Sequence, residues 1–395
     1  MTSTSPHRPD RPFLLDVSRL IWRLWRGRLP TGIDRVCLAY LDEFADRSLA
    51  MLQWGERRIV LGARHSQAVF GLLQKGALSG LDKRRLVTLL ARAIPHAALH
   101  PVDVSGLIHL NVGHTGLNSP TLGDWLRRQG LRSVYLIHDL IPITHPEYCR
   151  PGEAEKHAVR MRNALRSASG MIVNSAATGD ELAIFARSEG LPVPPILVAH
   201  LGIESLPPRS DASPSPRPYF LSIGTIEGRK NHTLLLRLWA TLREQMGEDT
   251  PDLVLIGQRG WEADEAFALL DGPQHAFGRV IELSRCSDAE LAAWIDHARA
   301  LLMPSYVEGF GLPVLEAMAR GTPVIATDLA VYREIAGSIP LLIGPCDEDA
   351  WREAILAYST DTPERERQRR RLTSFLPPDW SGHMARVNAW LAASG

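Results

Sequence analysis

Short apolar runs alternate with longer amphipathic segments along most of the chain. In the N-terminal half the apolar runs lie at 13–17, 106–112, 133–138, 170–175 and 196–202. In the C-terminal half they lie at 219–224, 252–257, 279–283, 300–305, 322–327 and 340–344. Near-continuous apolar runs of this length are typical of parallel strands that helices cover on both faces. Their alternation with amphipathic stretches such as 232–246 and 288–300 predicts doubly wound α/β units.

One segment interrupts this alternation. Residues 205–218 are rich in proline and serine and hold no large apolar residue except Leu206. Such a composition cannot bury enough apolar surface to order itself, so we interpret the segment as a linker. It divides the chain into two parts of similar size, each long enough for its own core.

The overall composition excludes several classes of protein. The chain has 44 basic and 44 acidic side chains, and this balance argues against a nucleic-acid-binding protein. Its four cysteines lie far apart without a zinc-binding spacing, so we expect free thiols in a reducing compartment. The first residues lack the apolar core of a signal peptide, and no apolar run approaches the roughly 20 residues that span a bilayer. We therefore expect a cytoplasmic protein, with any membrane contact peripheral and at the inner face.

The loop after the apolar run 300–305 carries the strongest chemical signal. Gly309 and Gly311 allow a ligand to approach the backbone, and a helix that starts after them offers free N–H groups to an anion such as a diphosphate. Glu308 and Glu316 lie on either side of this turn, and their carboxylates can accept hydrogen bonds from the vicinal hydroxyls of a sugar. A purely local role remains the alternative, with Glu316 stabilising the helix start and Glu308 solvated.

A second loop, GTIEGRKN, follows the apolar run that begins the C-terminal half. Gly224 opens this loop, Arg229 and Lys230 lie near its end, and Asn231 marks the expected start of a helix. Adjacent cations at such a place suit a diphosphate leaving group, because Arg offers a planar fork and Lys a compact charge. A solvated basic pair is the alternative.

These motifs together resemble the retaining glycosyltransferases of family 4, which have the GT-B fold. The resemblance covers residues 219–343 and rests on GTIEGRKN, on the spacing of Glu308 and Glu316, and on the GFGLP segment between them. It implies that Arg229 and Lys230 hold the donor diphosphate, that Glu316 binds the ribose and that Glu308 lies beside the donor sugar. It also assigns Gly224 and four consecutive turn residues to the donor site: Gly309, Phe310, Gly311 and Leu312.

The N-terminal half resembles the same family more loosely. Residues 134–149, VYLIHDLIPITHPEYC, resemble the segment that brings a catalytic-site histidine to the cleft, here His138 followed by Asp139. A histidine that only bonds to backbone is the alternative. Gly32, in LPTGIDRV, stands where family members have a glycine-containing loop after the first strand, and this places it in the donor site. His114 and Thr115 follow a further strand and are candidates to face the acceptor.

The resemblance also implies an architecture. We expect an α/β protein of the GT-B fold, with two Rossmann-like domains that face each other across a cleft. The acceptor-binding domain is expected at 1–204, the linker at 205–218 and the nucleotide-sugar-binding domain at 219–375. The last segment, 376–395, is expected to form a helix that packs back on the N-terminal domain.

The implied activity is transfer of a hexose, with retention, from a nucleoside diphosphate sugar to a hydroxyl of a glycan or lipid-linked glycan. Arg229, Lys230, Glu308 and His138 are the expected catalytic residues. The N-terminal motifs favour GDP-mannose, while UDP and dTDP sugars stay open. No cofactor or metal is expected, because the acidic run 347–349 precedes a helical stretch and fits an N-cap better than a metal site. The alternative function is a non-catalytic GT-B scaffold subunit of a polysaccharide-assembly complex.

Residues 18–29 mix basic and aromatic side chains. Four arginines alternate there with two tryptophans and several aliphatic residues. This pattern favours contact with an anionic membrane surface. A helix that buries its tryptophans and solvates its arginines is the alternative.

Overall fold

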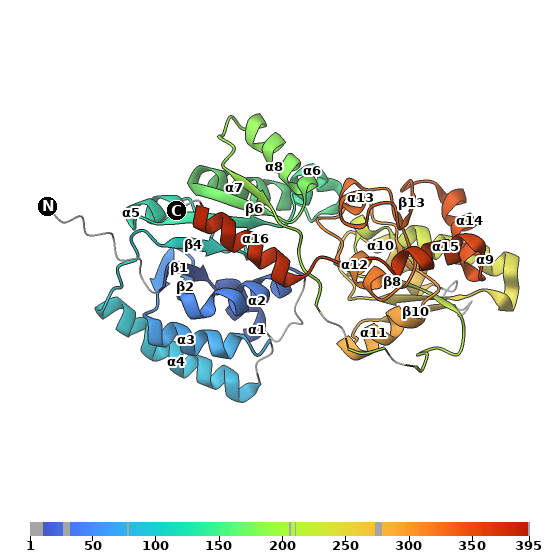
Figure 1. Cartoon of the computed structure of the whole chain (residues 1–395), viewed down its shortest axis with the longest axis horizontal. Helices are drawn as coiled ribbons and strands as arrows, with labels where there is room; N and C mark the ends of the chain where they lie inside the picture. Colours follow the sequence, from blue (N-terminus) through green and yellow to red (C-terminus); the bar gives the residue numbers. More distant parts are fainter. Residues whose placement is uncertain are drawn as a thin grey trace.

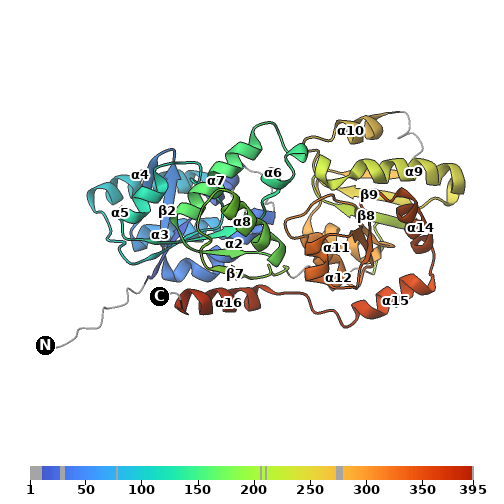
Figure 2. The ribbon, with the colours of Figure 1, turned by 90° about the horizontal axis from the view of Figure 1, so that it is seen from above.

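The protein is described by a computed structural model over residues 11–26, 32–76, 79–204, 207–209, 211–272 and 279–393. Each half of the chain contains a sheet with helices on both of its faces (Figure 1). A view from above shows the two domains end to end along the long axis of the molecule (Figure 2). The prediction of two α/β domains is confirmed.

The N-terminal sheet has the strand order β3-β2-β1-β4-β5-β6-β7 within the described ranges. Its strands are β1 (Phe13–Asp16), β2 (Ser48–Trp54), β3 (Arg57–Val60), β4 (Ile108–Asn111), β5 (Arg132–Ile137), β6 (Ala168–Val173) and β7 (Ile196–Val198). The sequence pattern missed β2 and β3, and β3 runs antiparallel to β2 at the sheet edge. The strand β2 follows a helix and a short 3-10 turn, η1 (Ala45–Arg47), with no Gly or Pro to mark its start.

Two groups of helices cover this sheet. The apolar core on one face includes residues of α1 (Ser18–Trp25), α2 (Gly32–Phe44), α3 (Ala63–Leu73) and α4 (Gly80–Leu99). The core on the other face includes residues of α5 (Leu122–Arg128), α7 (Glu153–Ser167) and α8 (Ala176–Ser188). A short helix α6 (Ile141–Thr144) and a 3-10 turn η2 (Pro146–Tyr148) lie in the loop after β5.

The C-terminal sheet has the order β10-β9-β8-β11-β12-β13, with all described pairs parallel. Its strands are β8 (Tyr219–Ile223), β9 (Asp252–Ile256), β10 (Val280–Leu283), β11 (Leu301–Met303), β12 (Val324–Thr327) and β13 (Leu341–Ile343). Each lies within one of the predicted apolar runs. These strands could be recognised in the sequence because helices cover the sheet on both faces, which favours near-continuous apolar runs.

Helices also cover both faces of the C-terminal sheet. One core contains α9 (His232–Met246), α10 (Asp264–Asp271) and α14 (Glu348–Ser359). The opposite face carries α11 (Asp288–His297), α12 (Leu312–Ala319) and α13 (Ala330–Ala336). Those residues belong to the same apolar cluster as the α1–α3 face of the N-terminal domain, so one core runs through both domains.

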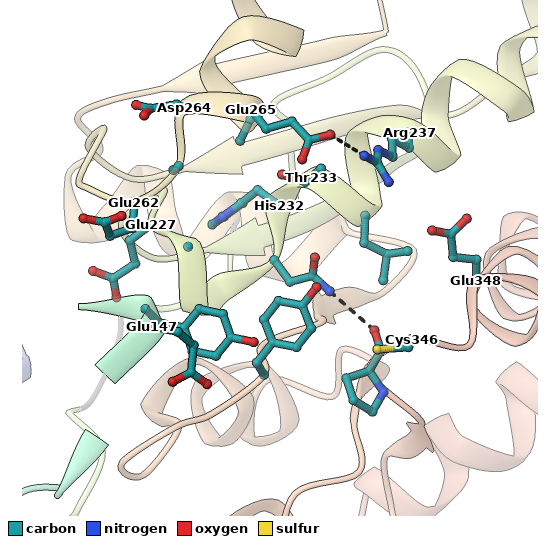
Figure 3. A pocket seen from close by; sticks show the side chains of 18 residues that line it. Glu147, Glu227, His232, Thr233, Arg237, Glu262, Asp264, Glu265, Cys346 and Glu348 are labelled. Carbon is teal, nitrogen blue, oxygen red and sulfur yellow. Dashed lines mark hydrogen bonds and ion pairs between the residues drawn. The ribbon is translucent and has the colours of Figure 1, made fainter. Parts of the chain in front are cut away.

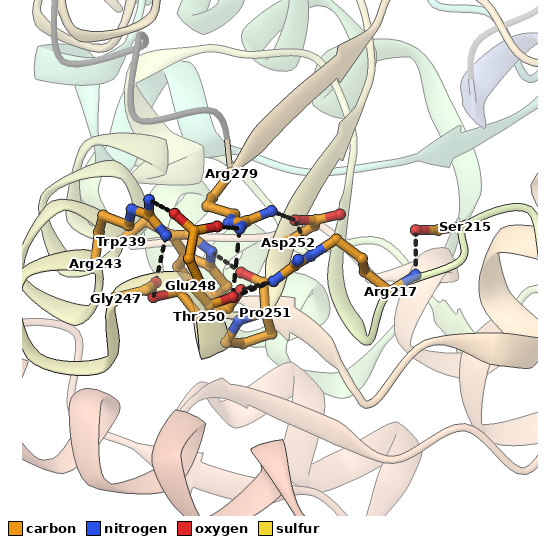
Figure 4. A network of polar contacts seen from close by, with 10 residues as sticks. All are labelled: Ser215, Arg217, Trp239, Arg243, Gly247, Glu248, Thr250, Pro251, Asp252 and Arg279. Carbon is orange, nitrogen blue, oxygen red and sulfur yellow. Dashed lines mark hydrogen bonds and ion pairs between the residues drawn. The ribbon is translucent and has the colours of Figure 1, made fainter.

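A polar network fixes the amino end of the C-terminal sheet (Figure 4). Arg217 comes just before β8 and lies 3.5 Å from Asp252, the first residue of β9. Arg279, before β10, approaches the same carboxylate at 3.6 Å and bonds to Glu248, in η4 (Gly247–Asp249), at 2.5 Å. These contacts fasten the end of the expected linker to the sheet.

The chain then crosses back to the N-terminal domain. After α15 (Pro363–Leu372), helix α16 (Trp380–Ala393) lies along the first domain in both ribbon views (Figures 1 and 2). The His383 ring bonds to the Tyr40 hydroxyl at 2.9 Å in the core, and Asn388 donates to Glu43 at 2.8 Å. Three apolar residues of α16 are buried in the shared core: Met384, Val387 and Leu391.

A pair of glycine substitutions tests how closely α16 is packed. A Cβ on Gly170 of β6 would lie 2.4 Å from the Trp390 ring of α16, whereas one on Gly71 of α3 would meet nothing within 4 Å. We expect Gly170→Ala to lower the free energy of unfolding by about 1–3 kcal/mol through overpacking. Gly71→Ala should raise it by up to about 1 kcal/mol, because alanine is the better helix former. Urea denaturation measures both, and equal effects of the two variants would contradict the packing described.

Candidate active site

Loops at the carboxyl ends of the two sheets meet between the domains. Gly309 follows β11, and His138 follows β5. A Cβ on Gly309 would lie 2.8 Å from the His138 carbonyl oxygen and 3.0 Å from the Asp139 Cβ, so only glycine permits this approach. Ligands of open α/β sheets bind at this edge. The structure therefore brings the predicted histidine and the predicted glycine turn into one place.

The two predicted cations form a buried cluster with Glu308. Arg229 and Lys230 lie in the 3-10 turn η3 (Gly228–Lys230) directly after the β8 loop. Arg229 Nη1 is 2.9 Å from Glu308 Oε2, and Lys230 Nζ is 2.5 Å from Oε1. Ser305 donates to Oε1 at 2.7 Å, and Glu227 lies 2.6 Å from Arg229. Both cations are thus paired, with the Lys230 side chain 10% exposed and the Arg229 side chain 22% exposed.

The protonation of this cluster follows from burial and pairing. Burial alone would raise the pKa of Glu308, but Lys230 and Arg229 outweigh it and hold the pKa at about 2. Burial lowers the pKa of Lys230 against the opposing effect of Glu308. Burial also acts to lower the pKa of Arg229, yet Glu308 and Glu227 raise it overall. Glu308 is therefore an ionised carboxylate that compensates the charges of Lys230 and Arg229.

Glycines shape the backbone around the cluster. Gly224 has φ +139°, and a Cβ there would lie 3.3 Å from Lys230 Cε. Gly311 precedes α12 with φ +97°, and a Cβ there would lie 2.5 Å from the Tyr332 ring. Phe310 is buried between these elements, and Leu312 begins α12. A Cβ on Gly32, the first residue of α2, would be 3.8 Å from Leu312 Cδ1, so the N-terminal domain also reaches this turn.

Glu316 lies in α12 and contacts the opposite domain. Its carboxylate is buried, and its Oε1 is 3.2 Å from Nη1 of Arg35, a residue of α2. Burial raises the pKa of Glu316, and Arg35 opposes that rise. No contact between Glu316 and the Glu308 cluster occurs among the described residues. The two glutamates therefore have separate partners, Glu316 in the N-terminal domain and Glu308 in its own domain.

His138 belongs to a group of three histidines. Its Nε2 bonds to the Val112 carbonyl at 2.8 Å, as the backbone alternative anticipated, while its Nδ1 has no hydrogen-bond partner in the described chain. The rings of His138 and His114 are 5.2 Å apart, and those of His114 and His157 are 6.1 Å apart. Burial lowers the pKa of each, that of His138 to about 4. At neutral pH His138 is therefore an uncharged ring with one nitrogen available.

A cavity of about 390 Å³ lies beside the Arg229 loop (Figure 3). The stacked rings of Tyr148 and Tyr306, 5.0 Å apart, come from the two domains and help to line it. Carboxylates make up most of its charged lining: Glu147, Glu227, Glu262, Asp264, Glu265 and Glu348. Such a lining favours hydroxyl donors and disfavours a diphosphate. The cavity therefore has an acidic lining, whereas the neighbouring cluster contains two cations. Glu227 belongs to both, because it lines the cavity and pairs with Arg229.

Two predictions about helix starts are confirmed. Asp347 caps α14 by accepting a hydrogen bond from the Ala350 N–H at 3.1 Å, as predicted. Asn231 stands at the start of α9 with φ +54°, but its side chain makes no capping bond and instead contacts the Pro345 carbonyl at 3.5 Å. Asparagine adopts this left-handed backbone conformation more easily than most residues. This backbone preference, and not a side-chain cap, explains why asparagine stands before α9.

Sequence reasoning missed two charged residues of the site. Glu227 is buried beside Arg229 and lies within the GTIEGRKN loop that was singled out, so its position was visible but its pairing was not. Arg35 follows Gly32 by three residues and looked like an ordinary helix residue. No local signal reveals that it contacts Glu316, which is 281 residues away in the chain.

Comparison with known proteins defines the C-terminal domain. Residues 208–374 match the family described as glycosyl transferases group 1. These residues are therefore similar in sequence to that family. The match includes both the Arg229–Lys230 loop and the Glu308–Glu316 segment.

Two proteins of Escherichia coli are related in sequence. O-antigen chain mannosyltransferase B is 32% identical over 245 residues, which cover 60% of this chain and 63% of that protein. Serotype-specific mannosyltransferase WbdA is 27% identical over 229 residues, which cover 54% of this chain and 28% of that protein. The chain thus spans less than two thirds of the length of either relative.

Solved structures show the fold. Anabaena HepE, in a crystal structure with UDP-glucose, has a TM-score of 0.66 at 16% identity, covering 96% of this chain and 99% of that one. Sucrose-phosphate synthase from Thermosynechococcus elongatus has a TM-score of 0.64 at 19% identity, covering 98% and 100%. The expected GT-B fold is confirmed. At these identities the likeness concerns the fold alone.

The buried His138 makes stability depend on pH. Its pKa is about 4 in the folded chain against 6.5 for an ordinary histidine, mainly because of burial. The unfolded chain therefore binds a proton between these values that the folded chain does not, and the free energy of unfolding falls as the pH falls from 6.5 to 4. We expect this decrease in the free energy of unfolding to be up to about 3 kcal/mol smaller in His138→Asn than in wild type, because the variant lacks the titrating ring. Urea denaturation at a series of pH values measures this, and parallel curves for the two proteins would contradict it.

Proposed function

We propose that the chain is a retaining glycosyltransferase that moves a hexose from a nucleoside diphosphate sugar to a hydroxyl of a glycan or lipid-linked glycan. The observation that carries the proposal is the pair of cations, Arg229 and Lys230, held at the carboxyl edge of a domain similar to glycosyl transferases group 1 by the carboxylates of Glu308 and Glu227. Two cations already fixed next to each other can pair with the two negative charges of a diphosphate.

The main chemical task is to stabilise the departing diphosphate. Arg229 offers a planar fork and Lys230 a point charge, and both are already fixed in position, so little reorganisation is needed. The start of α12 adds N–H groups and a positive dipole end close to Gly311. These groups supply charge stabilisation from the protein itself, and we propose that no metal ion is required.

The sugar lies between Glu308 and His138 in this proposal. A diphosphate that pairs with the cations frees Glu308 to accept hydrogen bonds from sugar hydroxyls, while His138 Nδ1 faces no protein partner. The bond from the anomeric carbon to the diphosphate breaks, and the acceptor oxygen bonds to the same face of that carbon. The acceptor proton passes to a phosphate oxygen, so no protein nucleophile is needed. The closed contact between Gly309 and His138 limits entry of water.

GDP-mannose is the donor that we favour. The two Escherichia coli relatives described above carry the name mannosyltransferase, and their names place one of them in O-antigen chain synthesis. HepE was solved with UDP-glucose, so a uridine donor is the main competitor. We propose a surface glycan or its lipid-linked precursor as the acceptor.

Thermal denaturation with GDP, UDP, dTDP and ADP in the presence of EDTA tests the donor site. We expect one nucleotide, GDP by preference, to stabilise wild type by about 2.7 kcal/mol at 100 times its dissociation constant. Lys230→Met should lose this stabilisation, because it removes one of the two phosphate-facing charges. Lys156→Met, which removes an exposed lysine of α7 that pairs with Glu153, is the control that should keep it.

The outcomes separate the proposal from its rival. Stabilisation that needs a divalent metal would overturn metal independence alone. Failure of all four nucleotides to stabilise wild type would refute the donor site and favour the non-catalytic scaffold. Binding without transfer of labelled mannose or glucose to any acceptor preparation would favour the scaffold as well.

We also propose a peripheral membrane contact through α1 and the end of β2. Trp22 and Trp25 are 39% and 43% exposed, and Trp54 is 74% exposed with its ring 5.4 Å from that of Trp22. Arg26 lies over the Trp22 ring. Arg19 and Arg23 instead pair with the buried Asp34, so the tryptophans face outward, which is the reverse of the packing alternative. Residues 27–29 of the expected segment lie outside the described residues, and no described helix is long and apolar enough to cross a bilayer.

Vesicle co-sedimentation tests this contact. We expect wild type to bind vesicles that contain phosphatidylglycerol more strongly than vesicles of phosphatidylcholine, because exposed aromatic and basic side chains suit an anionic interface. The Trp22→Ala/Trp25→Ala double variant should bind at least about tenfold more weakly, since it removes two large apolar surfaces. Trp261→Ala, at a tryptophan 37% exposed on the other domain, is the control. Equal binding by wild type and the double variant would refute the contact.

A further inference from the structure

Arg35 of the N-terminal domain reaches across the cleft to the C-terminal domain. Its Nη1 is 3.2 Å from Glu316 Oε1, and its Nη2 is 3.7 Å from Asp288 Oδ1. The Glu316 side chain is 6% exposed, whereas that of Asp288 is 66% exposed. The contact with Glu316 is therefore the one that water screens least.

The helix starts fix this contact. Gly32 begins α2 and lies against Leu312, which begins α12. Arg35 is three residues into α2 and Glu316 is four residues into α12, so both side chains lie about one turn beyond the point where the helices meet. Neither residue makes another ion pair to a buried partner in the part of the chain that is described.

We propose that Arg35 is a positioning residue of the donor site: it keeps the buried Glu316 carboxylate ionised and oriented to accept hydrogen bonds from the ribose hydroxyls of a nucleoside diphosphate sugar. The inference rests on the proposed function, because it takes Glu316 as the ribose ligand.

Burial makes an ionised Glu316 costly. It raises the pKa of Glu316, and two nearby carboxylates, Glu204 and Asp288, raise it as well. Arg35 is the cation that opposes them. A protonated Glu316 would donate one hydrogen bond and lose acceptor capacity, whereas a vicinal diol presents two donors. The guanidinium therefore maintains the acceptor state that ribose needs.

The geometry leaves room for both partners. A carboxylate offers about four lone-pair positions, and the contact with Arg35 uses one of them on Oε1. Oε2 has no hydrogen-bond partner among the described residues. Ribose can thus bind to Glu316 while Arg35 stays in place.

The contact also connects ribose binding to the domain arrangement. Arg35 and Glu316 belong to different domains, so the pair exists only when α2 lies against α12. A nucleotide whose ribose bonds to Glu316 binds more tightly when α2 lies against α12 and Arg35 holds that carboxylate. Binding of the nucleotide therefore favours this domain arrangement.

Isothermal titration with ribose and dideoxyribose nucleotides tests the role of Arg35. The ligands are GDP and 2′,3′-dideoxy-GDP, or the matching pair for whichever nucleotide stabilises wild type, titrated at several pH values between 5 and 8. Arg35→Gln should weaken GDP binding by roughly 10- to 100-fold, as expected for loss of a charged hydrogen bond. The loss should grow as the pH falls, because Glu316 protonates more readily without Arg35. Arg35→Lys should recover part of the affinity.

The dideoxynucleotide isolates the ribose contact. It lacks both hydroxyls, so Arg35→Gln should change its affinity little. In a Glu316→Gln background, Arg35→Gln should cost no further GDP affinity, because the group that Arg35 positions is already gone. A merely structural role of Arg35 would instead weaken both nucleotides equally and at every pH.

Glu334→Ala is the matched control for a general loss of interdomain contact. Glu334 of α13 accepts a hydrogen bond from the Ala176 N–H at 2.7 Å and lies 2.7 Å from the His200 ring, both in the other half of the chain. Removal of the Glu334 carboxylate should change the affinities for GDP and dideoxy-GDP by the same factor. Equal losses for the two nucleotides in Arg35→Gln, or tighter GDP binding, would overturn the inference. If wild type binds no nucleotide, the proposed function fails and not the role of Arg35 alone.

Discussion

Two cations withdrawn from water at the edge of the C-terminal sheet, Lys230 almost fully and Arg229 mostly, are the constraint on which the site depends. Arg229 and Lys230 cannot leave water unpaired, and Glu308 supplies the compensating charge at 2.9 and 2.5 Å. Because Glu308 is 78 residues further along the chain, the loops after β8 and β11 must lie next to each other. Because β8 and β11 are paired parallel strands, the loops that follow them start side by side. Glu227 adds a second carboxylate 2.6 Å from Arg229, so two carboxylates balance the two cations.

The N-terminal domain completes the site from the opposite side. The His138 carbonyl lies against Gly309, and the Arg35 side chain pairs with Glu316. Both ends of the segment 309–316 therefore contact the N-terminal domain. One apolar core runs through both domains, and α16 returns to the first domain after the second is complete. The cross-domain polar contacts are thus supported by packing that does not itself touch the ligand.

Much of the fold was predictable, and the failures have physical causes. The strands of the C-terminal sheet are mostly apolar and separated by helices, so each could be recognised. The strand β2 was missed because it joins the preceding helix through a 3-10 turn without Gly or Pro, and β3 because its burial is only partial. The prediction that Asn231 marks a helix start is confirmed, because α9 begins at the next residue, while its side chain contacts the Pro345 carbonyl.

The sequence by itself determined the local parts of the site: the cations of the GTIEGRKN loop, the glycine turn after β11, and the two glutamates on either side of it. Short-range spacing specifies these parts, because a loop and the first turns of a helix are built from neighbouring residues. Only the tertiary structure decided which charges meet, such as Arg35 with Glu316 across 281 residues and Glu227 with Arg229 in a buried pair. Such contacts depend on how sheets and domains pack, and they leave no periodic or compositional trace in one sequence.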